Sequence, residues 1–146
     1  MLVFAIRYYA NKRAADLKNT INAMYEIRNQ ALNYLVPFAQ AVNSCHLPEV
    51  DFAGMYSVDG LSPAQIWQKN VRDSKMLLDD KEREIVINFG VSLCRCSREQ
   101  IAEYSDKYIS ELNEICISYA EKKENKVRIM TTLVISAGVI TVLLFF

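Results

Sequence analysis

The final third of the chain contains almost nothing that would interrupt a helix. From Ser97 to Phe146 there is no proline and only one glycine, Gly138. A helix over residues 98–146 would have 49 residues and would extend for roughly 74 Å at about 1.5 Å per residue. Few globular helices are this long, whereas a helix that leaves a bundle and continues into lipid often is. The sequence therefore predicts one long final helix.

The end of that helix is apolar. Residues 129–146 carry no charged side chain, and as a helix they would span roughly 27 Å, close to the roughly 30 Å hydrocarbon core of a bilayer. A core helix would normally keep one polar face, and this segment has only small polar residues scattered around it. We therefore predict a transmembrane helix over 129–146.

The residues that precede the apolar segment are rich in cations. Residues 121–128 contain two glutamates and four basic residues, namely Lys122, Lys123, Lys126 and Arg128. Lysine and arginine beside a span keep that side of the membrane cytoplasmic. We expect the bulk of the chain to be cytoplasmic and attached to the cell membrane.

The first residues are apolar over a shorter length. Met1 to Ile6 are uncharged, which is too short for a span or a signal-peptide core. We interpret residues 1–10 as a membrane-proximal remnant, and the sequence leaves open whether an apolar stretch precedes it. The predicted organisation is therefore 1–10, a helical bundle domain over 11–128, and the span at 129–146.

The bundle domain has helical periodicity and few breakers. Between residues 11 and 35, apolar side chains recur every three or four positions, at Ala14, Leu17, Ile21, Met24, Ile27, Ala31 and Leu35. Pro37 then interrupts the helix or restarts it as a short second one. Residues 43–60 resemble a connection with a short helix around Phe52 to Tyr56. No strand pattern is convincing, so the predicted fold class is all-α, a compact bundle whose last helix enters the membrane.

Three later helix starts carry capping sequences. Ser62 is followed by proline and by glutamine at the third helical position, Asp79 is followed by Glu82, and Ser97 by Gln100. The final helix has a stripe at Ile101, Tyr104, Tyr108, Leu112, Ile115 and Tyr119. Ala102, Ile109, Cys116 and Ala120 broaden this face, so we expect it to pack on the earlier helices.

Composition and motifs argue against catalysis and nucleic-acid binding. The 17 basic and 17 acidic residues balance, whereas nucleic-acid binders usually have a basic excess. No serine elbow, phosphate loop or metalloprotease motif occurs. We therefore expect no enzyme activity, catalytic residue, cofactor or small-molecule substrate.

The cysteines raise the question of a zinc site. Its ligands would be Cys45, His46, Cys94 and Cys96. The single residue between Cys94 and Cys96 is a tighter spacing than the two to four typical of structural zinc sites. Reduced, partly buried thiols are the favoured interpretation, and we predict no metal.

Several segments together resemble the stage III sporulation protein AB family. They are the run from Glu84 to Gly90 with Leu93 after it, Ser97 to Gln100, Pro37-Phe38 with Ala41, and Gly60-Leu61-Ser62 followed by Trp67. Their order and spacing fit that family across nearly the whole chain, including the terminal apolar segment. Cys94 stands where the family usually has glycine. The resemblance assigns structural roles to Pro37, Trp67, Phe89, Gly90, Ser97 and Gln100.

The resemblance also implies a function. The family is similar to inner-membrane platform domains of type II secretion and type IV pilus systems, and its members belong to the channel apparatus between mother cell and forespore. It implies a non-enzymatic scaffold in the mother-cell membrane, with a secretion-type ATPase and other sporulation channel membrane proteins as partners. Candidate contact residues are the charged side chains near helix starts, Asp79, Lys81, Arg83, Arg98 and Glu99.

A second hypothesis remains open at the level of sequence. The apolar C-terminus and the stripe from Ile101 to Tyr119 would equally suit a C-tail-anchored adaptor or coiled-coil protein unrelated to secretion. In that case the stripe would be a seam between chains and not part of one chain's core.

Overall fold

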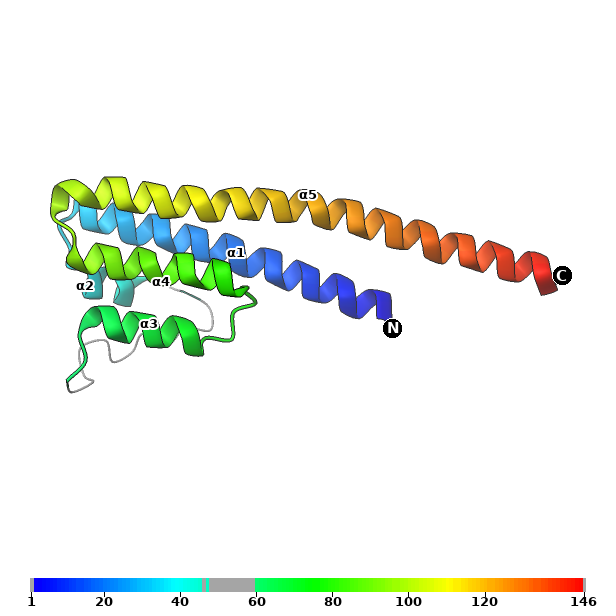
Figure 1. Ribbon diagram of the computed structural model, residues 1–146, viewed down its shortest axis with the longest axis horizontal. Coiled ribbons are helices and arrows are strands. Elements are labelled where there is room, and N and C mark those ends of the chain that lie inside the picture. The colour runs from blue at the N-terminus through cyan, green and yellow to red at the C-terminus, as the bar shows by residue number, and fades with distance from the viewer. Residues whose placement is uncertain (1, 46, 48–59, 146) are drawn as a thin grey trace.

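The computed structural model describes residues 2–45, 47 and 60–145. Over these residues the chain forms five helices and no strand, α1 (Leu2–Asn33), α2 (Phe38–Ser44), α3 (Pro63–Asp73), α4 (Asp80–Arg95) and α5 (Arg98–Phe145). Figure 1 shows the short helices gathered at one end of the two long ones. The predicted all-α class is confirmed. The predicted short helix at 52–56 lies outside the described residues.

Helix α1 is longer than the sequence pattern predicts. It begins at Leu2, not near residue 11, because neither glycine nor proline occurs before Pro37. Five of the seven predicted stripe residues are buried, namely Leu17, Ile21, Met24, Ile27 and Ala31. Leu35 was wrongly assigned to the stripe, since the helix ends at Asn33 and Leu35 has a positive φ of 55° and an exposed side chain.

Pro37 restarts the chain as predicted. Its φ of −55° and ψ of 145° place it at the N-cap of α2, where it lacks an amide that the helix would need to satisfy. The Ala41 amide donates to the Pro37 carbonyl at 3.0 Å. Ala41 and Val42 are fully buried, so this one short helix closes the end of the core.

Two of the three predicted caps form in full, and the one at Ser97 forms in part. Ser62 with Gln65 and Asp79 with Glu82 each make a complete capping box, at the starts of α3 and α4. At the start of α5, the Gln100 side-chain oxygen accepts from the Ser97 amide at 3.2 Å. The starts of α3 and α4 are thus fixed by interactions within four residues of the chain.

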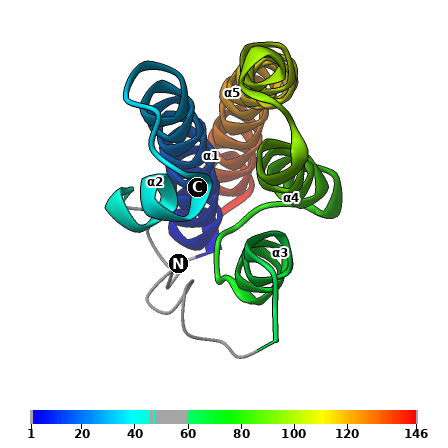
Figure 2. The same ribbon diagram turned by 90° about the vertical axis from the view of Figure 1, so that its left-hand side faces the viewer.

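The bundle is organised around α4. Viewed end-on, α4 lies between α3 and α5, while α1 and α2 complete the other side (Figure 2). Its buried residues Ile85, Val86, Ile87, Phe89 and Leu93 face partners on both sides. The core is thus a single cluster contributed by all five helices.

The stripe on α5 packs inside this core, with its centre displaced from the predicted one. Ile109 and Leu112 are almost fully buried, as is Ser105, whose hydroxyl donates to the Ile101 carbonyl. The predicted Tyr104, Tyr108 and Ile115 are only partly buried. Within the described residues this face contacts α1 and α4 of its own chain, so the structure gives it an intramolecular role.

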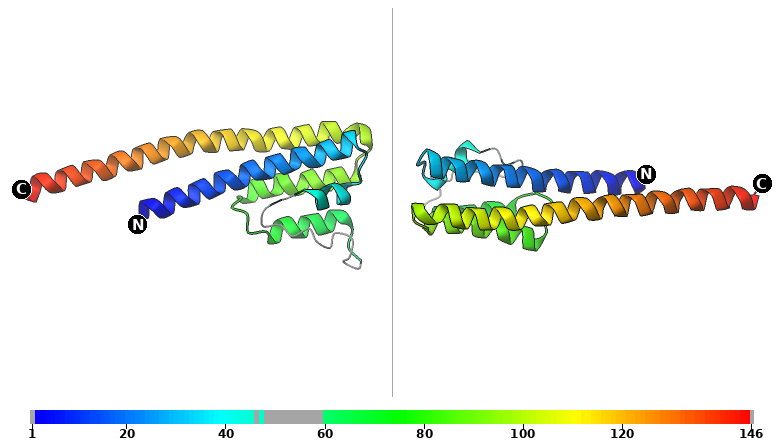
Figure 3. Two further views of the ribbon diagram at one scale, coloured as in Figure 1. Left: turned by 180° about the vertical axis from the view of Figure 1, so that it is seen from behind. Right: turned by 90° about the horizontal axis from the view of Figure 1, so that it is seen from above.

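Beyond the bundle, α1 and α5 continue in opposite directions and draw apart, and α5 extends past the start of α1 (Figures 1 and 3). We call this part, residues 2–12 and 120–145, the arm. Over the described residues, no helix combines the length and the apolar character that crossing a membrane requires. The predicted span at 129–146 is therefore not shown by the structure.

Candidate functional site

Helices α3 and α4 are joined through one tryptophan and one glycine. Trp67 is fully buried, and its indole N–H donates to the carbonyl of Val86 at 3.0 Å. A Cβ added at Gly90 would lie 2.2 Å from the indole nitrogen. The missing side chain at Gly90 is therefore what lets the indole reach the backbone of α4. Trp67 and Gly90 are two of the residues to which the resemblance assigned structural roles.

Two more aromatic rings surround Trp67. The Phe38 ring, from the start of α2, meets the indole edge to face with centroids 5.4 Å apart. Phe89 is fully buried in α4, and its ring centroid lies 6.4 Å from that of Trp67. Aromatic pairs in such arrangements contribute about 0.5–1.5 kcal/mol beyond the area they bury. Phe38, Trp67 and Phe89 thus connect α2, α3 and α4.

A part-buried ion pair, in which the carboxylate is the buried partner, connects α1 to α4. The Glu82 side chain is 1% exposed, and one of its oxygens accepts from Arg13 at 2.7 Å while the other accepts from the Asp79 amide at 2.8 Å. Arg13 also contacts the Asp79 carboxylate at 3.1 Å. The capping box of α4 and the ion pair thus share one carboxylate. We call Arg13, Asp79, Glu82 and Tyr119 the polar junction.

The polar junction lies where the arm leaves the bundle. The Arg13 guanidinium is 4.7 Å from the centroid of the Tyr119 ring, and the Tyr119 hydroxyl donates to the Ala10 carbonyl at 3.4 Å. A cleft of about 350 Å³ opens here, between the polar junction and residues Glu114 to Lys122 of α5. Three helices therefore converge on one arginine, which fixes the arm relative to the bundle.

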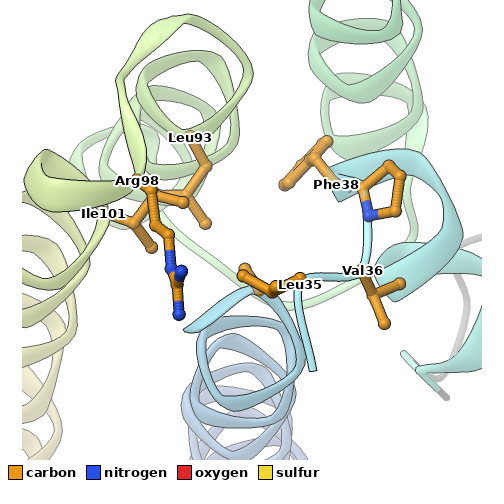
Figure 4. Close-up of a pocket in the computed structure, with 8 residues that line it drawn as sticks. Leu35, Val36, Phe38, Leu93, Arg98 and Ile101 are labelled. Carbon is orange, nitrogen blue, oxygen red and sulfur yellow. The ribbon is translucent and has the colours of Figure 1, made fainter. Parts of the chain in front are cut away.

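A second cavity lies at the opposite end of the bundle, which we call the distal tip. It has a volume of about 250 Å³, and its apolar walls come from the α1–α2 turn, the end of α4 and the start of α5. Figure 4 shows Arg98 extending from α5 toward Leu35 in the α1–α2 turn. Among the described residues, Arg98 forms no ion pair and is exposed. The cavity is therefore apolar with one cation at its edge.

The structure does not bring the five candidate contact residues together. Arg98 and Glu99 are exposed at the distal tip, whereas Asp79, Lys81 and Arg83 lie at the other end of α4, a 16-residue helix of roughly 24 Å. Arg83 is occupied within the chain, since it donates to the Ser74 hydroxyl at 2.9 Å and to the Met76 carbonyl at 2.9 Å. Asp79 forms an ion pair with Arg13 in the polar junction, and Lys81 is exposed.

Sequence reasoning missed Arg13, Glu82 and Asp16 as organising residues. Asp16 is buried and accepts from the Leu77 amide at 2.9 Å, which holds the segment between α3 and α4 against α1. The signal in the sequence for Asp16 was its position, directly before the stripe residue Leu17. Nothing local, however, identifies a partner 61 residues away in the chain.

The cysteines lie at helix ends and inside α5. Burial raises the pKa of Cys45 to about 12 and that of Cys94 to about 12, so both thiols are protonated at neutral pH. Within the described residues, no three potential metal-ligating side chains of histidine, cysteine, aspartate or glutamate gather. His46, the fourth ligand of the zinc hypothesis, lies outside them.

A sequence model of the stage III sporulation protein AB family matches residues 1–146. The chain belongs to this family. Membership in this family identifies the chain as a sporulation protein. No curated protein and no solved structure matches the chain.

Proposed function

We propose that this sporulation protein is a non-enzymatic, membrane-anchored platform subunit of the mother cell–forespore channel, which docks a secretion-type ATPase. The observation that carries the proposal is the arrangement of the chain as a compact bundle on a two-helix arm. The arm has exposed apolar side chains at its end. A cavity edged by Arg98, which forms no ion pair among the described residues, lies at the other extremity of the molecule.

The end of α5 supports the membrane part of the proposal. Its large apolar side chains are mostly exposed in the isolated chain, at Ile129, Leu133, Val134, Ile135, Val139, Ile140 and Leu143. Contiguous exposed apolar surface of this kind marks a protein or membrane contact. No charge interrupts residues 129–146, whereas a surface helix in water would carry a polar face. Lipid is the environment that suits this composition.

The distal tip supports the docking part. If the end of α5 is in the membrane, the start of α5 is the part of that helix farthest from the membrane. Arg98 and Glu99 are exposed there beside an apolar cavity, an arrangement that suits a partner offering an apolar side chain beside a carboxylate. A cytoplasmic ATPase would reach this surface without touching the bilayer. Other channel membrane proteins would contact the arm.

Binding of the purified ATPase to the full chain in vesicles tests this assignment. We expect Arg98→Glu to weaken binding at least about tenfold, because a buried or half-buried charge contact is replaced by repulsion. Lys81→Glu makes the same charge reversal at the opposite end of α4 and should bind like the wild type. Equal loss in both variants, or no ATPase binding by the wild type, would contradict docking through the distal tip.

A further inference from the structure

Two side-chain contacts join α1 to α5. Tyr119 donates to the Ala10 carbonyl, and Arg28 forms a two-point ion pair with Asp106 in which Nε lies 2.8 Å from the carboxylate. From the Tyr119–Ala10 contact outward, α1 continues through Arg7 to its start and α5 continues through Lys122 to its end.

Most of the arm's positive charge lies close to this contact along the two helices. Residues 1–12 and 121–128 contain six lysines and arginines and two glutamates, a net charge of +4. Since the whole chain is neutral, the remaining residues carry a net −4. We call Arg7, Lys122, Lys123, Lys126 and Arg128 the cationic collar.

Most of the collar charge on α5 lies on the face directed toward α1. Tyr119 is directed there, and Lys122, Lys123 and Lys126 follow it by three, four and seven residues, the spacing that keeps side chains on one helix face. Glu121 and Glu124 follow by two and five residues and lie on the other side. Lys122, Lys126 and Arg7 are exposed, so their charge is directed to the surroundings of the arm.

The collar is continuous with apolar surface. On α5 it is followed directly by the uncharged residues 129–146, and on α1 it is preceded by Phe4, which is 82% exposed. A free anion or a nucleic acid would use the charge and leave the apolar surface in water. A bilayer suits both the positive charge and the apolar surface, because phosphate headgroups lie directly above the hydrocarbon.

We propose that the cationic collar binds the headgroups of anionic phospholipids, with contributions from both helices of the arm. The proposal rests on the membrane attachment proposed above and adds a lipid preference to it. Basic residues near a membrane surface each raise the affinity for anionic lipid by about fivefold at moderate salt, and the gain falls as salt screens it. The bundle's net negative charge would at the same time hold it away from the surface.

Vesicle flotation of the full chain tests the proposal. The chain is diluted from detergent into neutral phosphatidylcholine vesicles or into vesicles that contain about one-third phosphatidylglycerol. We expect at least about tenfold stronger partitioning into the anionic vesicles, with the difference lost at about 0.5 M salt. The variant Lys122→Gln/Lys123→Gln/Lys126→Gln should lose most of this preference and still bind neutral vesicles like the wild type.

The matched control is Lys69→Gln/Lys75→Gln/Lys81→Gln, which removes three exposed lysines from the bundle. It should keep the full preference for anionic vesicles. Equal wild-type partitioning into both vesicle types, or equal loss in both triple variants, would overturn the collar while leaving membrane attachment intact. Failure of the wild type to float with either vesicle type would overturn the attachment and the collar together.

Discussion

Trp67 occupies the space that a side chain at Gly90 would need. Its indole nitrogen would be 2.2 Å from a Cβ at that position, and the same nitrogen donates to Val86, one turn earlier on α4. The separation of α3 and α4 is therefore determined by the absence of one methyl group. Glycine normally costs about 1 kcal/mol in a helix, and here that cost is offset by close packing.

Gly90→Ala should lower the free energy of unfolding by about 1–3 kcal/mol, because an added methyl group in a close-packed core forces neighbouring groups apart. The loss should occur although alanine is the better helix former. Denaturant unfolding of the full chain in detergent, followed by circular dichroism, measures it. In a Trp67→Leu background the same substitution should be nearly neutral. An equally large cost there would show that the indole is not the cause.

The ion pairs that Arg13 and Arg28 of α1 form with Glu82 and Asp106, respectively, should differ in their contribution to stability. Arg13→Met leaves the buried Glu82 carboxylate without its cation, and we expect a loss of about 3–5 kcal/mol. Arg28→Met breaks the exposed pair with Asp106, for which about 1 kcal/mol or less is expected. Thermal unfolding of the two variants provides the comparison. Similar losses in both would contradict the central role of the polar junction.

The α5 stripe gives a test between one chain's core and a seam between chains. Leu112→Ala should destabilise the fold by about 2–5 kcal/mol because Leu112 is fully buried. Ile117→Ala, at an exposed position of the same helix, should have little effect. Light scattering should find the same oligomeric state in both variants and in the wild type. A change of oligomeric state with Leu112→Ala would favour the seam.

The buried thiols predict how stability depends on alkaline pH. Burial raises the pKa of Cys45 and Cys94 from the ordinary 9.0 to about 12, so the folded chain keeps protons that the unfolded chain releases. This contribution to stability is complete below pH 9 and is lost as the pH rises toward 12. Stability should therefore fall less steeply above pH 9 in Cys45→Ala/Cys94→Ala than in the wild type. Equal slopes would contradict the raised pKa values.

The sequence was informative wherever the determining interactions are local. The capping boxes at Ser62 and Asp79 each lie within four residues, and the restart at Pro37 follows from the fixed φ of proline. Periodicity likewise predicted most of the α1 stripe. It failed at Leu35, because the apolar spacing continues two residues past Asn33, where α1 ends and the α1–α2 turn begins.

The polar junction was beyond sequence reasoning for a physical reason. Arg13 and Glu82 are 69 residues apart, and both have an ordinary local explanation, one as a surface cation and the other as a capping residue. Only the packing of α4 against α1 makes Glu82 buried and therefore makes Arg13 necessary. The same holds for Arg98, whose place beside the α1–α2 turn depends on the direction of α5.

Alkaline carbonate extraction of membranes from cells that express the full chain tests the central claim, attachment through the end of α5. We expect the wild type to remain in the membrane pellet, together with the control Ile117→Glu, which places a charge on the part of α5 that belongs to the bundle. Leu133→Glu/Ile140→Glu should be released, since each charge in the hydrocarbon costs about 2.5–3.5 kcal/mol. Recovery of the wild type in the supernatant as a folded protein would contradict the account.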